Sequence, residues 1–588
     1  MTCDTTNDRA DMHTEPTLIV RRPAAPAVAD FPAELHPVLA RLYAARHLVS
    51  ASALQNTLDH LDPPARLKGM EAAISLLVSM LEQGKHILIV ADFDADGATS
   101  CALAVRALRL LGAAKVSYVV PNRFEYGYGL TPEIVQVAAE QQPDLIVTVD
   151  NGISSVDGVA AARALGIQVL VTDHHLPGSV LPEADAIVNP NQPDDTFPSK
   201  HLAGVGVIFY VMLALRARLR DIGWFEQPHL PEPNLAQLLD LVALGTVADV
   251  VPLDHSNRIL VAQGLGRINQ GQCCAGLRAL LQVAGRAPGR LVATDLGFML
   301  APRLNAAGRL EDMSLGIACL LTDDAAAALE MAQRLDGLNR ERRRIEAAMQ
   351  TQALAALDTL ELGNRLPRGL CLFDAAWHQG VIGILASRIK DRTHRPVICF
   401  APSSDKEIKG SARSVSGVHI RDVLDAVATR HPHLLQKFGG HAMAAGLTLA
   451  RCHLDAFQAA FAEEVARHLG EDDLRGWLLS DGALEVQDLA LELAELLRAA
   501  GPWGQGFPPP LFDGQFELVE RRIVGEKHLK MILRHPEGKR LDAIAFNQTA
   551  EHLLPGQQLH AAYRLDVNEY RGERTLQLIV EHLAAVSP

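Results

Sequence analysis

Short apolar runs alternate with Ala- and Leu-rich segments between His86 and Val251, and this alternation restricts the possible folds of the chain more than any other feature. The apolar runs are HILIVAD, VSYVV, LIVTVD and IQVLVTD, which are rich in Val and Ile. The segments between them have helical periodicity and read TSCALAVRALRLLG, TPEIVQVAAEQ and SSVDGVAAARALG. Strands that alternate with helices in this way form a parallel sheet, so we predict a parallel α/β domain in this region.

Four segments place carboxylates or imidazoles where a predicted strand or helix ends. They are ADFDADG with Asp92, Asp94 and Asp96, TVDNGIS with Asp150, TDHHLPG with Asp173, His174 and His175, and GTVADVVPL with Asp249. The carboxyl ends of parallel strands gather at one edge of an open sheet, so we expect the first three segments to meet there. Crowded carboxylates repel one another and raise each other's pKa unless a cation lies among them.

This combination of side chains predicts a site for Mn²⁺ or Mg²⁺, with two ions expected. Carboxylate oxygens and one or two neutral imidazoles suit these ions, whereas zinc prefers thiolates or more histidines. A carboxylate shared by two ions holds them ~3.5–4 Å apart, which is the spacing used for in-line attack at phosphorus. A single aspartate after a strand is commonly a helix cap or a turn residue. Four such segments at four element ends favour the metal site over that alternative.

The rest of the chain predicts a long helix, a second α/β region and a β-rich end. From Asp323 to Leu354 there is no proline and the apolar residues keep helical spacing. We interpret this segment as a helix that links two domains, and a bundle helix within one domain is the alternative. GLCLFDA, GVIGILASRIKD and PVICFAP then predict a smaller α/β domain. After the Pro- and Gly-rich GPWGQGFPPPLF, successive strand patterns predict a small antiparallel barrel.

The predicted barrel contains a basic stretch. Its cationic residues are Arg521, Arg522, Lys527, Lys530, Arg534, Lys539 and Arg540. A basic face on a small barrel suits single-stranded nucleic acid, but a solvated edge whose lysines discourage aggregation fits equally well. The formal net charge of −14 argues weakly against nucleic acid, although a total does not describe a local surface.

Composition also bears on the compartment and the size. The 8 cysteines are scattered and form no C-x-x-C pair, which predicts reduced thiols in the cytoplasm rather than disulfides or a zinc site. No apolar run approaches the ~20 residues that span a bilayer. The polar start MTCDTTNDRADMHTEP predicts a disordered tail and not a signal peptide. A length of 588 residues predicts three or four domains.

In the order of its motifs, the chain resembles the DHH phosphoesterase superfamily and, within it, the RecJ family of single-strand-specific exonucleases. The motifs are DFDADG, DNGIS, DHH, ADVVPL, PRLNAAGR, WHQGVIGILASR, GSARS and FGGHAMAAG. The resemblance extends from about Leu81 to the C-terminus, and GGHAMAAG marks the DHH-associated domain. The implied organisation is a tail and lead-in segment (1–45), a DHH metal-binding domain (46–322), a connecting helix (323–357), a DHH-associated substrate-binding domain (358–470) and an OB-like nucleic-acid-binding domain (471–588).

The resemblance also implies roles for individual residues. The implied metal ligands are Asp94, Asp96, Asp150, His174 and Asp249, with Asp150 shared between two ions. His175 would face the scissile phosphate, and Asp92 and Asp173 would support the ligands. The implied substrate contacts are Arg123, Arg303, Asn305, Arg309, His378, Ser411, Arg413, Gly440 and His441, of which the last four would hold the terminal phosphate.

One position departs from the pattern of the superfamily. Related pyrophosphatases have a histidine four residues before the first ligand aspartate, and this chain has Val90 there. We therefore expect one tightly held ion, bound by Asp96, Asp150, His174 and Asp249, and a second ion that is held more loosely.

The implied activity is a 5′-to-3′ exonuclease that degrades single-stranded DNA to 5′-mononucleotides in DNA repair and recombination. The expected partner is single-stranded DNA with a free 5′ end, without a membrane, and the expected oligomeric state is a monomer. A single-strand-binding protein and a helicase are the candidate protein partners. The alternatives are a DHH phosphodiesterase of short oligonucleotides or cyclic dinucleotides, and a non-catalytic scaffold that binds single-stranded DNA.

Overall fold

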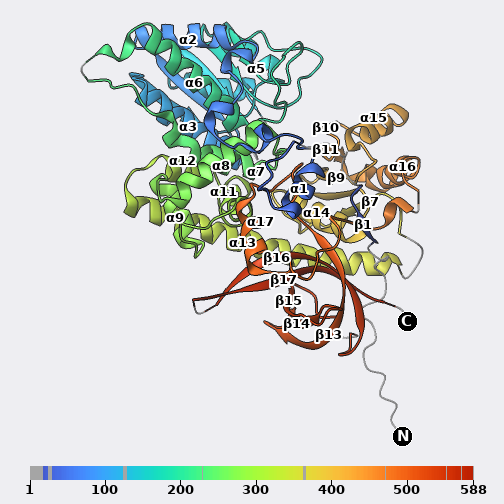
Figure 1. Cartoon of the computed structure of the whole chain (residues 1–588). Helices are drawn as coiled ribbons and strands as arrows, with labels where there is room; N and C mark the ends of the chain where they lie inside the picture. The colour runs from blue at the N-terminus through green and yellow to red at the C-terminus, as the bar shows by residue number, and fades with distance from the viewer. Residues whose placement is uncertain are drawn as a thin grey trace.

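The four predicted strands and one further strand, β6, form a five-stranded parallel sheet, which confirms the predicted parallel α/β domain (Figure 1). The computed structural model describes residues 18–23, 30–122, 129–227, 229–361, 366–470, 472–550, 553–570 and 572–586. The strand order is β3-β2-β4-β5-β6. The strands are β2 (His86–Ala91), β3 (Lys115–Val119), β4 (Leu145–Val149), β5 (Gln168–Thr172) and β6 (Ala186–Val188). β2 is buried along its whole length, because strands flank it and helices cover both faces of the sheet.

Alternate residues of β2 point into two different cores. Ile87 and Ile89 belong to the core on one face, which also contains residues of α2 (Met70–Glu82), α3 (Ala95–Leu110) and α6 (Gly204–Asp221). Leu88 and Val90 belong to the core on the other face, with α4 (Pro132–Ala139) and α5 (Val156–Ala164). The two-residue period of a strand produces this division. Because both faces of the sheet are covered by apolar cores, polar groups of this sheet gather at the carboxyl ends of its strands.

Further helices extend the first domain. They are α7 (Leu239–Ala248), α8 (His255–Asn269), α9 (Ala275–Val283), α10 (Ala293–Asp295), α11 (Ala301–Leu310) and α12 (Ser314–Leu321), with the π-helical turn η6 (Leu296–Leu300) between α10 and α11. Short 3₁₀ turns are η1 (Ser52–Leu54), η2 (Leu58–His60), η3 (Pro64–Arg66), η4 (Trp224–Glu226), η5 (Leu235–Leu238), η7 (Arg451–His453) and η8 (Asp472–Leu474). None of the helices in the described residues is long and apolar enough to cross a membrane.

The helix α13 (Ala325–Glu361) connects the two α/β domains and has 37 residues. It packs against α9, α11 and α12 of the first domain and against α14 (Ile382–Thr393) of the second. An ion pair fixes the contact with α11 and another fixes the contact with α14. Nε of Arg303 on α11 donates to Asp336 over 2.9 Å, and Nε of Arg388 on α14 donates to Glu346 over 3.1 Å. Asp336 and Glu346 are both buried, so α13 is tied to both domains through carboxylates that lie away from water.

The second domain contains a five-stranded mixed sheet in the order β10-β11-β9-β8-β7. Figure 1 labels four of these strands. Its strands are β7 (Leu370–Phe373), β8 (Val397–Pro402), β9 (Glu407–Arg413), β10 (Lys437–Gly440) and β11 (Ala444–Ala450). β7 and β8 are parallel, and the other neighbours are antiparallel. The helices α15 (Ile420–Arg430) and α16 (Leu454–Ala466) pack on the sheet, where Phe457 and Phe461 of α16 lie in the core.

The C-terminal domain is a closed barrel in the order β13-β14-β15-β17-β16, as predicted. The expected antiparallel pairing holds for every pair of neighbours except β15 and β17, which are parallel. The strands are β13 (Phe512–Val524), β14 (His528–Arg534), β15 (Arg540–Ala545), β16 (Gln558–Tyr570) and β17 (Glu573–Ala585), and α17 (Leu491–Ala499) precedes them. Carboxylates accompany part of the basic stretch. Lys530 lies 3.8 Å from Asp542, and Arg534 lies 3.5 Å from Glu517. The barrel face is therefore less basic than its lysines and arginines alone indicate.

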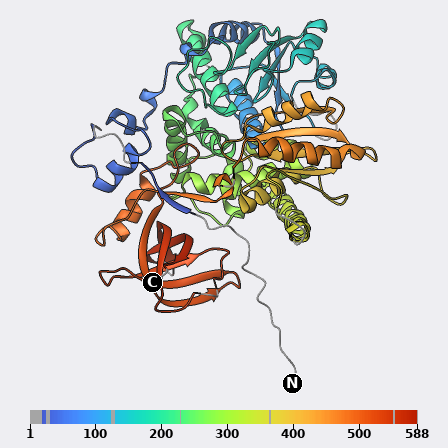
Figure 2. The ribbon, with the colours of Figure 1, turned by 90° about the vertical axis from the view of Figure 1, so that its right-hand side faces the viewer.

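An N-terminal clasp joins the start of the chain to the C-terminal domain, and we define it as β1 (Leu18–Arg21) with Arg22 and Arg46. β1 pairs in parallel with β12 (Trp477–Ser480). Arg22 and Arg46 both form ion pairs with Asp481, at 3.2 and 2.9 Å, and Arg21 forms one with Asp513 at 2.8 Å. The strand β1 and the nearby helix α1 (Pro37–Ala44) lie within residues 1–45, the segment expected to be a tail and lead-in. The clasp lies beside the C-terminal domain in Figure 2.

Replacing the carboxylate that the clasp surrounds tests its contribution to stability. The Asp481 and Arg46 side chains are both 1% exposed. We expect Asp481→Ala to lower the free energy of unfolding of the C-terminal part by about 3–5 kcal/mol, because two guanidinium groups lose their buried partner. Unfolding in guanidinium chloride and limited proteolysis at the barrel junction measure this loss of stability.

The matched control is Glu183→Ala, which removes the exposed ion pair between Arg163 and Glu183. An exposed pair of this kind contributes at most about 1 kcal/mol. Equal stability of the two variants would contradict the role of the clasp.

Candidate metal centre

The loop after β2 holds the first group of aspartates in place. Oδ1 of Asp94 caps α3, since it accepts hydrogen bonds from the N–H groups of Asp96 (2.9 Å) and Gly97 (3.0 Å). Asp96 is buried, and its carboxylate accepts from the N–H groups of Gly204 (2.7 Å) and Val205 (3.0 Å). These two donors belong to the first turn of α6, whose N–H groups have no partner inside the helix. Both carboxylates are therefore fixed by helix N-termini.

Asp150 follows β4 and turns its side chain over the edge of the sheet. It is buried and has a backbone φ of +63°, which is uncommon for a residue other than glycine. The next residue supports this conformation. Nδ2 of Asn151 donates to the carbonyls of Val90 (3.2 Å) and Val149 (2.9 Å) and so ties the ends of β2 and β4 together.

Asp173 orients the two histidines that follow β5. Its Oδ1 accepts from the N–H groups of His174 (2.7 Å) and His175 (3.1 Å) and from Nδ1 of His175 (2.7 Å). Its Oδ2 accepts from the N–H group of Ile153 over 2.9 Å. Asp173 therefore sets the position of the backbone and the ring orientation of His175, which is the arrangement that a supporting carboxylate requires.

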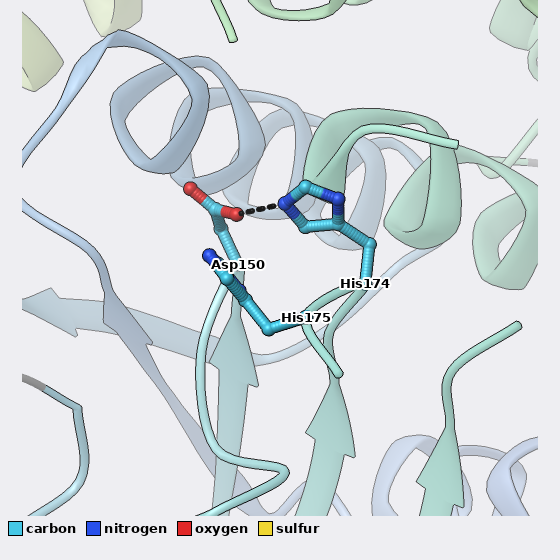
Figure 3. A group of neighbouring side chains, drawn as sticks. All are labelled: Asp150, His174 and His175. Atoms are coloured by element: carbon cyan, nitrogen blue, oxygen red, sulfur yellow. Dashed lines mark ion pairs between the residues drawn. The ribbon is translucent and has the colours of Figure 1, made fainter. Parts of the chain in front are cut away.

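Side chains from three strand ends and one helix end meet at this edge. Nε2 of His174 lies 3.1 Å from Oδ1 of Asp150, the pair joined by a dashed line in Figure 3, and 3.5 Å from Oδ2 of Asp249 after α7. Three groups bring one possible ligand atom from each member within 4.8 Å of one another. They are Asp150–His174–His175, Asp96–His174–Asp249 and Asp92–Asp94–Asp150. Asp92, for which sequence analysis expects only a supporting role, joins the third group.

Burial and like charge disturb the protonation of these groups. Burial and the nearby Asp249 raise the pKa of Asp96 to about 7, and burial and the nearby Asp94 do the same for the pKa of Asp249. Burial and Asp96 raise the pKa of Asp150 well above its usual value. Burial lowers the pKa of His174, so its imidazole is neutral near pH 7.

This donor set fits divalent cations. A neutral imidazole nitrogen that faces two carboxylate oxygens places lone pairs beside one another, and a cation relieves that repulsion. Carboxylate oxygens with one imidazole are ligands that Mn²⁺ and Mg²⁺ accept. Asp150 belongs to two of the three groups, as a carboxylate shared between two ions must.

Two glycines that sequence reasoning missed let helices approach the aspartates. A Cβ atom on Gly204 would lie 2.6 Å from Cβ of Asp150, and one on Gly245 would lie 2.2 Å from Oγ1 of Thr99 and 2.9 Å from Oδ1 of Asp96. Such distances are far below van der Waals contact, so only glycine allows α6 and α7 to pack this closely. The glycines spaced by one residue in LAGVGVIF, at the start of a helix pattern, are the signal that could have indicated the first of them.

The predicted phosphate-binding arginines differ in their surroundings. Arg123 lies outside the described residues. Arg303 is buried, and it donates through Nε to Oδ1 of Asp336 over 2.9 Å and through Nη1 to the carbonyl of Met299. Its Nη2 lies 2.9 Å from the same carboxylate oxygen in the ion pair. Nη1 of Arg309 donates to the carbonyl of Gly380 over 3.3 Å. Arg303 is thus engaged inside the fold, and Arg309 lies at the junction of the two α/β domains.

Two other predicted substrate contacts bond to the backbone. Oδ1 of Asn305 accepts from the N–H group of Ala95 over 2.8 Å and so supports the aspartate loop. Nδ1 of His378 accepts from the N–H group of Gly380 over 3.0 Å. The residue types alone do not reveal these roles, because each bond joins segments whose contact depends on the tertiary fold or on a local turn.

The second domain faces the metal centre through the hairpin of β10 and β11. Gly440 ends β10 and His441 follows it, and the His441 ring lies 6.2 Å from the His175 ring with an angle of 21° between the ring planes. On β9, Nη1 of Arg413 donates to Oγ of Ser411 (3.1 Å) and to the carbonyl of Ala412 (2.8 Å). Burial and the neighbouring His175 lower the pKa of His441, so this imidazole is neutral near pH 7.

The close approach of Gly204 to Asp150 provides a test of the metal centre. We expect Gly204→Ala to weaken Mn²⁺ binding by roughly tenfold or more, because the new methyl group displaces Asp150 and the N–H donors to Asp96. Calorimetric titration of the metal-free protein with Mn²⁺ measures the affinity.

The control lies on the same helix. A Cβ atom on Gly206 would meet Cδ2 of Leu202 at 3.4 Å, an ordinary contact, so Gly206→Ala should leave the affinity unchanged. An alanine in a helix interior should also stabilise the fold by roughly 0.5–1 kcal/mol. Equal Mn²⁺ affinities in the two variants would show that Gly204 has no special role.

The chain matches three domain families along its length. Residues 86–246 match the family described as "DHH family, N-terminal domain". Residues 367–467 match the "DHHA1 domain" family, and residues 480–582 match the "RecJ OB domain" family. The three matches fall on the first α/β domain, the second α/β domain and the barrel, in that order.

Whole-chain relatives agree with these matches. The chain is 54% identical over 569 residues to the "Single-stranded-DNA-specific exonuclease RecJ" of Escherichia coli, covering 96% of this chain and 98% of that protein. The protein of the same name from Salmonella typhimurium is 53% identical over 568 residues, with 96% and 98% covered. The fold matches the crystal structure of RecJ in complex with Mn²⁺ from Thermus thermophilus with a TM-score of 0.79 and 32% identity, covering 94% of this chain and 77% of that one.

These similarities confirm the resemblance in the motifs. With about half of its residues identical to proteins that it covers almost completely, the chain belongs to the RecJ family of single-stranded-DNA-specific exonucleases.

Proposed function

We propose that this chain is a metal-dependent exonuclease that degrades single-stranded DNA from its 5′ end to 5′-mononucleotides, in DNA repair and recombination. The observation that carries the proposal is the convergence of aspartates and histidines at the sheet edge, directly opposite the His441 hairpin of the second domain. The names of the curated relatives support single-stranded DNA as the substrate. The structures of Thermus thermophilus RecJ in complex with Mn²⁺ and with Mg²⁺ support these two ions.

Asp94, Asp96, Asp150, His174 and Asp249 are the proposed ligands of two ions, with Asp150 shared between them. Asp96, Asp150, His174 and Asp249 form the proposed tighter site, and Asp94 contributes to the looser one together with the shared Asp150. When bound, such ions lower the pKa of a water molecule and stabilise the negative charge that develops on phosphoryl oxygens.

His175 is the proposed contact to the scissile phosphate. Its Nδ1 is bonded to Asp173, so Nε2 is the ring atom that we assign to a phosphoryl oxygen. Asp173 acts here as a positioning residue, because it fixes the ring without meeting the substrate. No covalent bond between protein and substrate is needed for this chemistry.

The second domain supplies the proposed recognition of the 5′ end. Ser411, Arg413, Gly440 and His441 are the groups assigned to the terminal phosphate. The His175 and His441 rings lie 6.2 Å apart, so the hairpin lies next to the proposed metal ligands. A terminal phosphate held by the hairpin therefore brings the adjacent phosphodiester to the metal centre, which favours release of mononucleotides.

Two alternatives make different predictions. A phosphodiesterase for short oligonucleotides or cyclic dinucleotides would prefer those substrates to a long strand. A non-catalytic scaffold would have lost metal ligands, and all five proposed ligands are present here.

The proposed setting is a monomer in the cytoplasm that works with a single-strand-binding protein and a helicase. The seven cysteines within the described residues are free thiols, which fits a reducing compartment. Size-exclusion chromatography with light scattering tests the monomer.

Degradation of end-labelled strands tests the activity. With Mn²⁺ or Mg²⁺, a long single strand labelled at its 5′ end should release a labelled mononucleotide at early times, whereas a 3′-labelled strand should shorten gradually. EDTA should abolish the reaction. We expect Asp150→Ala to lower the rate by roughly 10³-fold or more, because both ions lose their shared ligand.

A blunt duplex and a dinucleotide serve as comparison substrates. Little cleavage of the duplex would support single-strand selectivity. Rapid cleavage of the dinucleotide together with an intact long strand would sink the exonuclease proposal and favour the short-oligonucleotide phosphodiesterase.

A further inference from the structure

The loop that follows the proposed ligand Asp249 has a strained backbone. Val250, the next residue, has a φ of +62°, a conformation that is rare for a β-branched residue. Its side chain is 63% exposed, so burial of this side chain does not explain the conformation. Backbone strain of this kind persists only where the surrounding structure imposes it. Residues 250–253, which we call the Asp249 loop, therefore need support from other parts of the chain.

A turn that lies just before the barrel supplies such support. We define it as residues 504–507, in which the N–H group of Phe507 donates to the carbonyl of Gly504 over 3.1 Å. The carbonyl of Gln505, at the tip of this turn, accepts from the N–H group of Leu253 over 2.7 Å. The 504–507 turn is thus hydrogen-bonded to the last residue of the Asp249 loop, although about 250 residues separate the two along the chain.

Glycine at the third position of the turn sets the direction of this carbonyl. Gly506 has a φ of +68°, which is the left-handed conformation that the third residue of a type II turn requires. A residue with a side chain favours a type I turn, whose central peptide is flipped. That flip would point the Gln505 carbonyl away from Leu253. Gly506 also leaves room for the loop, since a Cβ atom on it would lie 3.0 Å from Cβ of Pro252.

Aromatic rings anchor the 504–507 turn. The rings of Trp503 and Phe507 stack with their centroids 5.0 Å apart and an angle of 10° between the ring planes. The Tyr43 ring of α1 lies 6.1 Å from the first and 6.3 Å from the second. The guanidinium of Arg258 on α8 lies 4.8 Å from the centroid of Phe507, and its Nη1 donates to the carbonyl of Leu253 over 3.3 Å. Arg258 therefore contacts both the turn and the loop.

The Asp249 loop is also joined to the donors that hold Asp96. Nδ2 of Asn257 donates to the carbonyls of Pro252 (2.9 Å) and His201 (2.6 Å). His201 lies three residues before Gly204, whose N–H group bonds to Asp96. A displacement of the loop would therefore reach two of the proposed metal ligands, Asp249 directly and Asp96 through the start of α6.

We infer that Gly506 is a positioning residue for the metal centre, because the turn that it forms holds the Asp249 loop and, with it, the carboxylate of Asp249. The inference rests on the proposed function, since it concerns the same metal site. It assigns the C-terminal part of the chain a role in metal binding in addition to its proposed contact with DNA. Gly506 acts through the loop and is not itself a ligand.

Calorimetric titration of the metal-free protein with Mn²⁺ tests this role. We expect Gly506→Ala to weaken the tighter Mn²⁺ site roughly tenfold, because a flipped peptide releases the loop and lets Asp249 move. The looser site, to which Asp249 does not belong, should keep its affinity. Binding of a single strand in EDTA, measured by fluorescence anisotropy, should be unchanged. Strand degradation should be slow at limiting Mn²⁺ and recover at higher Mn²⁺.

Two variants serve as controls. Gly285 has the same φ of +68°, and a Cβ atom on it would meet nothing within 4 Å. Gly285→Ala therefore introduces similar backbone strain away from the Asp249 loop and should keep the wild-type Mn²⁺ affinity. Gln505→Ala removes an exposed side chain but keeps the carbonyl that bonds to Leu253, so it should also bind Mn²⁺ as wild type does.

A third variant covers the case in which Gly506→Ala does not fold, which circular dichroism would show. Gly506→Asn should lose less Mn²⁺ affinity than Gly506→Ala, because asparagine tolerates the left-handed conformation better. Equal Mn²⁺ affinities in the Gly506 variants and Gly285→Ala, or an equal loss at both metal sites, would overturn the inference. A wild type that binds Mn²⁺ but releases no mononucleotide would instead contradict the proposed exonuclease, and the titration would still decide the role of Gly506.

Discussion

Repulsion among buried carboxylates is the constraint on which the rest of the first domain depends. Asp96, Asp150 and Asp249 lie where burial and like charge raise their pKa values, so the fold must hold them together against a force that separates them. It does so with N–H groups and amides rather than with cationic side chains. The first turn of α6 bonds to Asp96, Asn151 ties β2 to β4 behind Asp150, and Asn305 supports the loop between β2 and α3. Neutral donors of this kind fix the oxygens and leave their negative charge for the ions.

Ion pairs with buried carboxylates also fix the arrangement of the two α/β domains. α13 carries Asp336 toward Arg303 of the first domain and Glu346 toward Arg388 of the second. The family resemblance implies a substrate contact for Arg303, but its guanidinium is bonded to α13 and to the turn η6. Together with the bond from Arg309 to Gly380, these contacts set the separation at which His441 faces His175. The geometry of the centre is therefore defined as much by the connecting helix as by the sheet edge.

Local pattern was enough to predict the parallel sheet, the closed barrel and the convergence of the aspartates. Buried strands leave continuous apolar runs, and the topology of a parallel sheet brings their carboxyl ends to one edge. The contacts that were not predicted all join distant segments. Asn305 bonds to Ala95 and β1 pairs with β12, and neither contact leaves a periodic signal in the chain. The close approach of Gly204 to Asp150 could be predicted only in part, since the sequence shows the glycine but does not show which residue it contacts.

The N-terminal clasp has a consequence for the order in which the protein is made. β1 leaves the ribosome more than 450 residues before β12, the strand with which it pairs. At synthesis rates of about 5–20 residues per second, β1 waits roughly 25 to 90 s for its partner. During that interval its edge is unsatisfied, and Arg21 and Arg22 keep the segment charged and discourage it from pairing with other chains. Pairing of β1 with β12 is therefore among the last events of folding, and a chain that stops before β12 exposes its own beginning to proteases.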